Sequence, residues 1–272
     1  MGERWHKGFR NRLIAVMVIM WLAIWCGWLF TFPLAIYQLL SIGFKEAVTA
    51  TGWIYIIASG IIHTPYSIFL AHAYQHGEIS VVYPIARGSG IGLTALLGWS
   101  FLEETGSFPG TAGIALIFGG ILFLGVPAYR QKESLHKIGL ALSVGCTIVA
   151  YSLVDKVGVQ YADAVPYLCF MFFVNAVCMG PYVWRNHQAT ILQIARNSYS
   201  YILLIGVGAA GTYLIILFAF TMGQVGYIVA VREFAVVIGA LLGIIFLKEQ
   251  LTIPKAIAIA AITLGLVCIK AS

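Results

Sequence analysis

Two arginines and one glutamate are the residues in this sequence best suited to chemistry, because they lie inside long apolar runs. Arg87 lies in one such run, and Arg232 and Glu233 lie in another. An arginine deep in a bilayer costs at least about 2.5–3.5 kcal/mol, so it should face protein, water or a ligand. Its planar guanidinium group suits carboxylate, phosphate or phosphonate. We therefore predict that Arg87 and Arg232 bind an anionic substrate group, with structural ion pairing as the alternative.

Glu233 has two interpretations. Its carboxyl group could bind and release a proton within the membrane, or it could form a salt bridge with Arg87. Because successive residues point in different directions around a helix, we expect Glu233 not to pair with its neighbour Arg232.

Aromatic and small residues are predicted to shape a cavity around the arginines. Tyr66, Tyr83 and Tyr227 are expected to line it. Pro84 would weaken the run that carries Arg87 and expose polar backbone to a substrate. Three glycines follow Pro84 at spacings that favour either a helix break or close helix packing. These glycines are Gly88, Gly90 and Gly92.

Other patterns argue against several kinds of site. His72 and His76 are four residues apart, a spacing that could hold a metal, but no third ligand is suitably placed. The five cysteines lie in apolar runs and form no Cys-x-x-Cys pattern. The glycines at 88–92 follow no strand, which excludes a nucleotide-binding loop. We expect no catalytic residue, no metal and no cofactor.

The composition indicates which elements must carry these residues. Apolar residues make up 61% of the 272 and charged residues 10%, whereas a soluble domain has about 45–50% and 25%. A membrane-crossing helix needs about 20 mostly apolar residues. Nine runs meet this requirement, which predicts an all-α integral membrane protein with nine transmembrane helices. The runs are 13–40, 53–75, 79–102, 109–128, 136–154, 164–184, 200–222, 225–247 and 253–270.

The charged residues predict the orientation of these helices. The chain has 16 lysines and arginines against 10 acids, and no basic segment alternates with stacking aromatics, so we expect no nucleic-acid partner. Most basic residues fall between runs on the side of the N-terminus, which the positive-inside rule makes cytoplasmic. Nine crossings then place the C-terminus outside. The residues assigned to the cytoplasmic side are Arg4, Lys7, Arg10, Arg12, Arg130, Lys132, Lys137, Arg185, Arg196, Lys248 and Lys255.

The chain matches itself at an offset of 145 residues. This register pairs Arg87 with Arg232 and Glu104 with Glu249. Matched runs lie an odd number of crossings apart, so the two copies must run in opposite directions through the bilayer. That is an inverted-topology repeat, which is common in secondary transporters.

The repeat divides the chain into four expected parts. Residues 1–12 form a basic cytoplasmic tail, and 13–128 form a first copy of four helices. A linker follows at 129–135, and 136–270 form a second copy of five helices. The run 136–154 has no partner, so the first helix of the five-helix unit is absent from the first copy.

Several motifs resemble one known family. They are Tyr83-Pro84-Ile85-Ala86-Arg87-Gly88-Ser89-Gly90, Phe101-Leu102-Glu103-Glu104, Val231-Arg232-Glu233-Phe234 and Phe246-Leu247-Lys248-Glu249. With them the chain resembles the EamA-like families of the drug/metabolite transporter superfamily, and the first motif resembles a phosphonate-associated subgroup. The resemblance implies two five-helix inverted repeats. The missing first helix departs from that plan, and either an upstream helix or a genuine nine-helix form would account for it.

The function expected from these observations is secondary transport. The chain would move a small organic anion or zwitterion by alternating access around a midplane cavity, as a multi-pass protein of the bacterial cytoplasmic (inner) membrane. A lipid-modifying enzyme would need a nucleophile, a metal cluster or paired acids near an interface, so we expect no enzyme. A scaffold or sensor derived from a transporter fold is the alternative. The partners expected are the small-molecule substrate and the lipid bilayer. Whether two copies of the chain form a homodimer is left open by the sequence.

Overall fold

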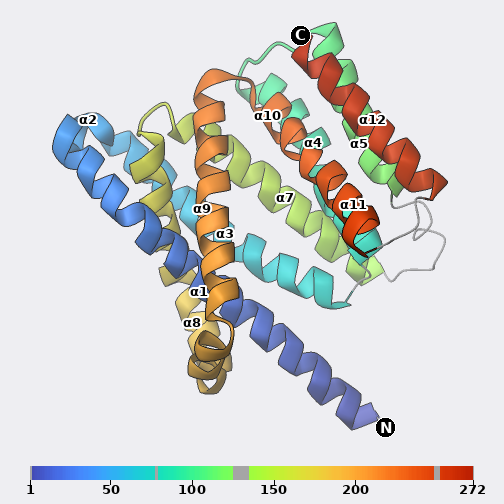
Figure 1. Ribbon diagram of the computed structural model, residues 1–272. Coiled ribbons are helices and arrows are strands. Elements are labelled where there is room, and N and C mark those ends of the chain that lie inside the picture. The colour runs from blue at the N-terminus through green and yellow to red at the C-terminus, as the bar shows by residue number, and fades with distance from the viewer. Residues whose placement is uncertain (1, 77–78, 125–134, 248–251, 272) are drawn as a thin grey trace. The chain divides into compact units, whose positions relative to one another are not determined.

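The computed structural model describes residues 2–76, 79–124, 135–247 and 252–271, and these are almost entirely helical (Figure 1). Within these ranges the extended structure is limited to an isolated antiparallel bridge between Val48 and Ala162. The helices are α1 (Gly2–Ile42), α2 (Phe44–Ala47), α3 (Ala50–His76), α4 (Ile79–Phe101), α5 (Phe108–Leu124), α7 (Leu135–Gly158), α8 (Ala164–Asn197), α9 (Tyr199–Met222), α10 (Val225–Arg232), α11 (Phe234–Leu247) and α12 (Ile253–Lys270).

Six of the described helices contain segments long and apolar enough to cross a membrane. Together they make the chain a multi-pass integral membrane protein. The other three expected runs fall on α4, on the shorter α5, and on α10 with α11, so the total of nine crossings stays a prediction. The six segments are Val16–Ile42, Ala50–Ala73, Ile138–Gly158, Ala164–Arg185, Tyr199–Met222 and Ile253–Lys270.

Several helices extend beyond the limits expected from the apolar runs, among them α1, which begins at Gly2 instead of residue 13, and α7 and α8. Helix α8 continues to Asn197, so Arg185 and Arg196, which were assigned to a loop, are exposed helical residues. Helix α7 continues to Gly158 and includes Asp155 and Lys156. The end of an apolar run is therefore not the end of the helix, because a helix can continue with polar side chains once those side chains reach water or protein partners.

The chain forms two compact units that interleave along the sequence. Unit 1 consists of Met1–His72 with Val154–Met222, and unit 2 consists of Ala73–Leu153 with Gly223–Ser272. The expected division into copies 13–128 and 136–270 does not coincide with these units, because each unit takes helices from both copies. The copies themselves stay a prediction.

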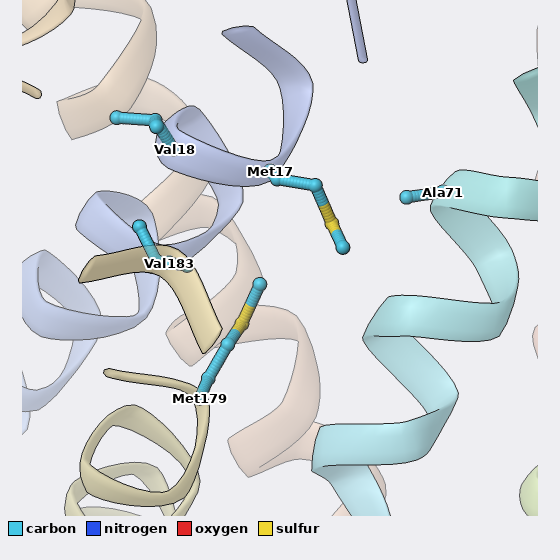
Figure 2. Close-up of a cluster of buried hydrophobic side chains, with 5 residues drawn as sticks. All are labelled: Met17, Val18, Ala71, Met179 and Val183. Carbon is cyan, nitrogen blue, oxygen red and sulfur yellow. The ribbon is translucent and has the colours of Figure 1, made fainter. Parts of the chain in front are cut away.

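Unit 1 is built around α1, which packs against α8 and α9. Figure 2 shows one part of its core, in which apolar side chains from α1, α3 and α8 are buried. The indole of Trp21 donates a hydrogen bond to the carbonyl oxygen of Ala176 at 2.9 Å and ties α1 to α8. The buried residues drawn are Met17, Val18, Ala71, Met179 and Val183.

In unit 2, α5 and α12 lie side by side (Figure 1) in close backbone contact. A Cβ atom at Gly113 would lie 2.5 Å from the carbonyl oxygen of Gly265, and one at Gly120 would lie 3.1 Å from the Cβ of Ala261. The later residue of α5 thus meets the earlier residue of α12, so the two helices run antiparallel. The expected repeat matches these two helices with each other, and an inverted repeat requires this orientation.

The expected run 225–247 is not one helix. Helices α10 and α11 meet at Glu233. There the backbone N–H of Glu233 donates to the carbonyl of Ala230 at 3.0 Å, and that of Val236 donates to the carbonyl of Glu233 at 2.9 Å. Both bonds span three residues instead of four, so a single tight turn interrupts the α-helix.

Of the two alternatives for the run that carries Arg87, a helix break is excluded, because α4 continues unbroken from Ile79 to Phe101 through Pro84 and the glycines. A glycine weakens a helix by only about 1 kcal/mol, whereas backbone groups without hydrogen bonds cost several kcal/mol in lipid. The glycines instead allow close packing. A Cβ at Gly88 would lie 3.1 Å from Leu122, one at Gly90 3.0 Å from Ile148, and one at Gly92 3.4 Å from Phe118.

Candidate functional site

Arg87, Arg232 and Glu233 come together in unit 2. Arg87 Nη1 lies 2.9 Å from Glu233 Oε1, and Arg232 Nε lies 3.4 Å from the same oxygen. Arg232 Nη1 also donates a hydrogen bond to the hydroxyl of Tyr151 at 3.3 Å. Helices α4 and α7 and the turn between α10 and α11 thus meet at one group of side chains. We call Arg87, Tyr151, Arg232 and Glu233 the arginine cluster.

The contact between Arg232 and Glu233 contradicts the expectation that these neighbours do not pair. That expectation assumed a regular helix, in which adjacent side chains diverge. Arg232 is the last residue of α10 and Glu233 lies in the turn, so the helical spacing does not apply to this pair.

Helix α10 is positioned against α4 by two features. Gly226 would place a Cβ only 3.0 Å from the Cα of Ala95, so the absence of a side chain there permits close approach. The carboxylate of Glu104 accepts a hydrogen bond from the backbone N–H of Val225, with distances of 2.9 and 3.1 Å to its two oxygens. A negative charge at the first residue of a helix also complements the helix dipole. This contact fixes the start of α10, while Glu233 fixes its end.

The arginine cluster is largely withdrawn from the surface. The side chain of Glu233 is 2% exposed, that of Arg232 14% and that of Arg87 27%. A buried carboxylate needs charged or hydrogen-bonding partners, and both guanidinium groups supply them. Of the two interpretations of Glu233, the structure contains the salt bridge with Arg87, and proton binding at this residue stays a prediction.

The cluster has the donor groups that an oxyanion requires. A guanidinium group carries five N–H donors in one plane, more than a single carboxylate oxygen accepts. Two such groups side by side can hold a carboxylate or phosphonate through paired hydrogen bonds. Substrate binding by Arg87 and Arg232 is therefore chemically reasonable here and stays a prediction.

The predicted tyrosines have different surroundings. In unit 2 the hydroxyl of Tyr227 accepts a hydrogen bond from the backbone N–H of Ser107 at 2.9 Å, at the start of α5. Tyr66 belongs to unit 1, where its ring lies 6.2 Å from that of His63. The side chain of Tyr83 lies outside the described residues. The contact of Tyr151 with Arg232 makes Tyr151 a further candidate for the site.

Of the two histidines whose spacing could hold a metal, the structure describes the side chain of one. His72 Nε2 lies 3.3 Å from the hydroxyl of Tyr182, whereas the side chain of His76 is not among those described. In the described part of the chain, no group of three histidines, cysteines or acids is arranged to hold a metal ion.

A second polar cluster, in unit 1, was not predicted. Asp155 of α7 is completely buried. The hydroxyl of Tyr167 donates to its Oδ1 at 2.8 Å, and the hydroxyl of Tyr213 donates to its Oδ2. The apolar run 136–154 ends directly before Asp155, and no role was predicted for this residue. An acid directly after an apolar run, followed by more residues of helical pattern, was the signal that could have found it.

A cavity of about 360 Å³ lies against α4 and α5 in unit 2. The described side chains that line it are mainly apolar, and they include none of the predicted substrate residues. This cavity therefore suits an apolar chain better than an anion. Its larger lining residues are Leu93, Leu96, Trp99 and Phe118.

The sequence was compared with protein families and with curated proteins. A sequence model of the EamA-like transporter family matches residues 136–271, which is half of the chain. No curated protein matches.

Proposed function

Because the chain belongs to the EamA-like transporter family, whose members are membrane transporters, we propose that it is a secondary transporter of a small organic anion or zwitterion. The arginine cluster binds the anionic end of the substrate. Transport follows alternating access, in which the site opens to each side of the membrane in turn. The proposal places the protein in the cytoplasmic membrane of a bacterium.

The observation that carries this proposal is the meeting of two guanidinium groups at one buried carboxylate oxygen. A substrate carboxylate can replace Glu233 Oε1 as an acceptor for Arg87, Arg232 or both. Because Glu233 lies at the turn between α10 and α11, such a replacement removes a contact between this turn and Arg87 or Arg232. Substrate binding and helix movement are thereby connected at one position.

A second observation supports a polar ligand in unit 2. Thr94 and Ser152 are completely buried, and within the described part of the chain their hydroxyl oxygens have no hydrogen-bond partner. Thr94 is on α4, which carries Arg87, and Ser152 follows Tyr151 on α7. Buried hydroxyls normally have partners, and water or a polar substrate can provide them.

Counterflow in proteoliposomes tests the proposal. The panel comprises amino acids, carboxylates, phosphonates and sugar phosphates. Arg87→Gln and Arg232→Gln should each weaken binding of the transported compound by about 1.5–3 kcal/mol, the value of a charged hydrogen bond, which corresponds to about 10- to 150-fold in affinity. Lysine should restore it only in part, because it lacks the planar fork.

The matched control is Arg196→Gln, which removes an exposed arginine from α8 and should leave counterflow unchanged. If both cluster variants remain monodisperse and transport like the wild type, the arginines are structural. If no member of the panel exchanges through the wild-type protein, the proposed substrate class is wrong.

A further inference from the structure

The buried carboxyl group of Asp155 in unit 1 has no role in the proposed substrate site. It belongs to the segment Ile138–Gly158, which can cross the membrane, and lies one turn before the end of that segment. Its two oxygens accept hydrogen bonds from Tyr167 and Tyr213. A carboxylate buried in a membrane-spanning segment is costly, and acids in such positions often belong to ion or substrate pathways.

The groups around Asp155 come from four helices. From α3, His63 is buried, and its Nδ1 lies 2.9 Å from the carbonyl oxygen of Ser59. From α7, the ammonium group of Lys156 donates to the carbonyl oxygen of Phe220 at 2.7 Å, at the end of α9. Tyr167 comes from α8 and Tyr213 from α9. Within the described residues, the titratable groups that interact with Asp155 are His63, Tyr167 and Tyr213. Lys156 follows Asp155 in the chain, but its ammonium group is bound to Phe220.

The buried ring of His63 lies against the ring of Tyr213, which is the half-buried tyrosine of this group. The two rings meet edge to face with centroids 5.4 Å apart. Tyr213 is only half-buried and touches Asp155 directly, so it connects the carboxyl group to its surroundings.

The size of the site limits the ligand that can bind at Asp155. The residue is completely buried, and each oxygen already has a hydroxyl group at hydrogen-bonding distance. A sodium ion or an organic ammonium group would have to displace at least one tyrosine. A proton adds to the carboxylate without requiring additional space.

We propose that Asp155 is a proton-binding site and that the proton is a second ligand of this protein. One proton from water adds to one carboxylate oxygen, which turns the carboxylate into a neutral carboxyl group. The new O–H is a donor, so it reverses or breaks the hydrogen bond to one tyrosine. Protonation thereby changes the contact of α7 with α8 or α9. The role of this step in a transport cycle rests on the proposed function, but proton binding itself does not.

Infrared difference spectroscopy of the chain in lipid tests proton binding without any substrate. A protonated carboxyl group has its own carbonyl stretching band. This band should appear in the wild type as the pH falls from mildly alkaline to mildly acidic values and should be absent from Asp155→Asn. The matched control is Asp163→Asn, which changes the other aspartate of unit 1, where Gln38 donates to the carboxylate at 2.8 Å. Asp163→Asn should keep the band.

A second variant keeps the test decisive if Asp155→Asn does not fold. Tyr213→Phe removes one hydrogen bond to the carboxyl group and should therefore shift the frequency of the band. A band that is identical in wild type, Asp155→Asn and Tyr213→Phe overturns the proposal. So does a wild type in which no carboxyl band changes with pH, or one in which the band responds to sodium chloride at constant pH and not to pH.

Transport measurements test the consequence for the cycle. With a compound that the wild type exchanges, Asp155→Asn should keep counterflow, because counterflow needs no ion gradient. Accumulation of the compound driven by a pH gradient should be at least tenfold lower in Asp155→Asn than in the wild type. Arg87→Gln should reduce both. Full gradient-driven accumulation by Asp155→Asn overturns the coupling role, and loss of counterflow in wild type would count against the proposed function alone.

Discussion

At the scale of single residues, Glu233 determines the arrangement of the arginine cluster. Its Oε1 atom is the acceptor for Arg87 and for Arg232, and its side chain is 2% exposed. An arginine in a membrane helix needs such a partner when no substrate is present. The glutamate therefore stabilises the empty site, and the same contact must weaken when an anion binds.

Replacing Glu233 by glutamine should lower stability, because both arginines lose a charged acceptor. We expect a loss of about 1.5–3 kcal/mol, measured as the free energy of unfolding in mixed detergent micelles. Glu46→Gln, in which the carboxyl group is exposed on α2, should change stability by less than about 0.5 kcal/mol. Equal effects of the two substitutions would contradict the role given to Glu233.

At the scale of elements, the close contact of α5 with α12 holds part of unit 2 together. A Cβ at Gly265 would lie 2.6 Å from the carbonyl oxygen of Gly113. The atom in the way belongs to the backbone, so it cannot move aside as a side chain would. Such contacts are the means by which small residues stabilise helix pairs in membranes.

Gly265→Ala should therefore destabilise the protein by about 1–3 kcal/mol, as overpacking does. The matched control is Gly119→Ala in α5, where a Cβ would meet no atom within 4 Å, and it should have no destabilising effect. Unfolding in mixed micelles, followed by circular dichroism, compares the two. A control that is as unstable as Gly265→Ala would show that the loss of glycine itself, and not the contact, is responsible.

At the scale of the whole molecule, the number of crossings decides whether the two termini lie on the same side of the membrane. The basic residues predict a cytoplasmic N-terminus, and the nine crossings predicted from the sequence would then place the C-terminus outside. Fusions of a phosphatase, active only outside, and of a fluorescent protein, active only inside, can be made at residue 272. We expect phosphatase activity and no fluorescence. Fluorescence at that position would indicate an even number of crossings.

The sequence by itself determined the class of the protein and its most informative charges. Apolar runs have to become helices in a membrane, because lipid offers no partner to backbone groups. Arg87, Arg232 and Glu233 could be singled out because charges in such runs are costly. The family could be recognised for the same reason, since its motifs lie at those charges and at the ends of their helices.

Only the tertiary structure decided which charges meet. The turn at Glu233 depends on hydrogen bonds of three-residue span, and no proline or glycine marks it in the sequence. The site of Asp155 is formed by residues from α3, α7, α8 and α9, so no local pattern contains it. The division of the chain into two interleaved units could not be predicted either. Helix packing depends on the fit of side chains from distant segments, and hydropathy alone does not specify that fit.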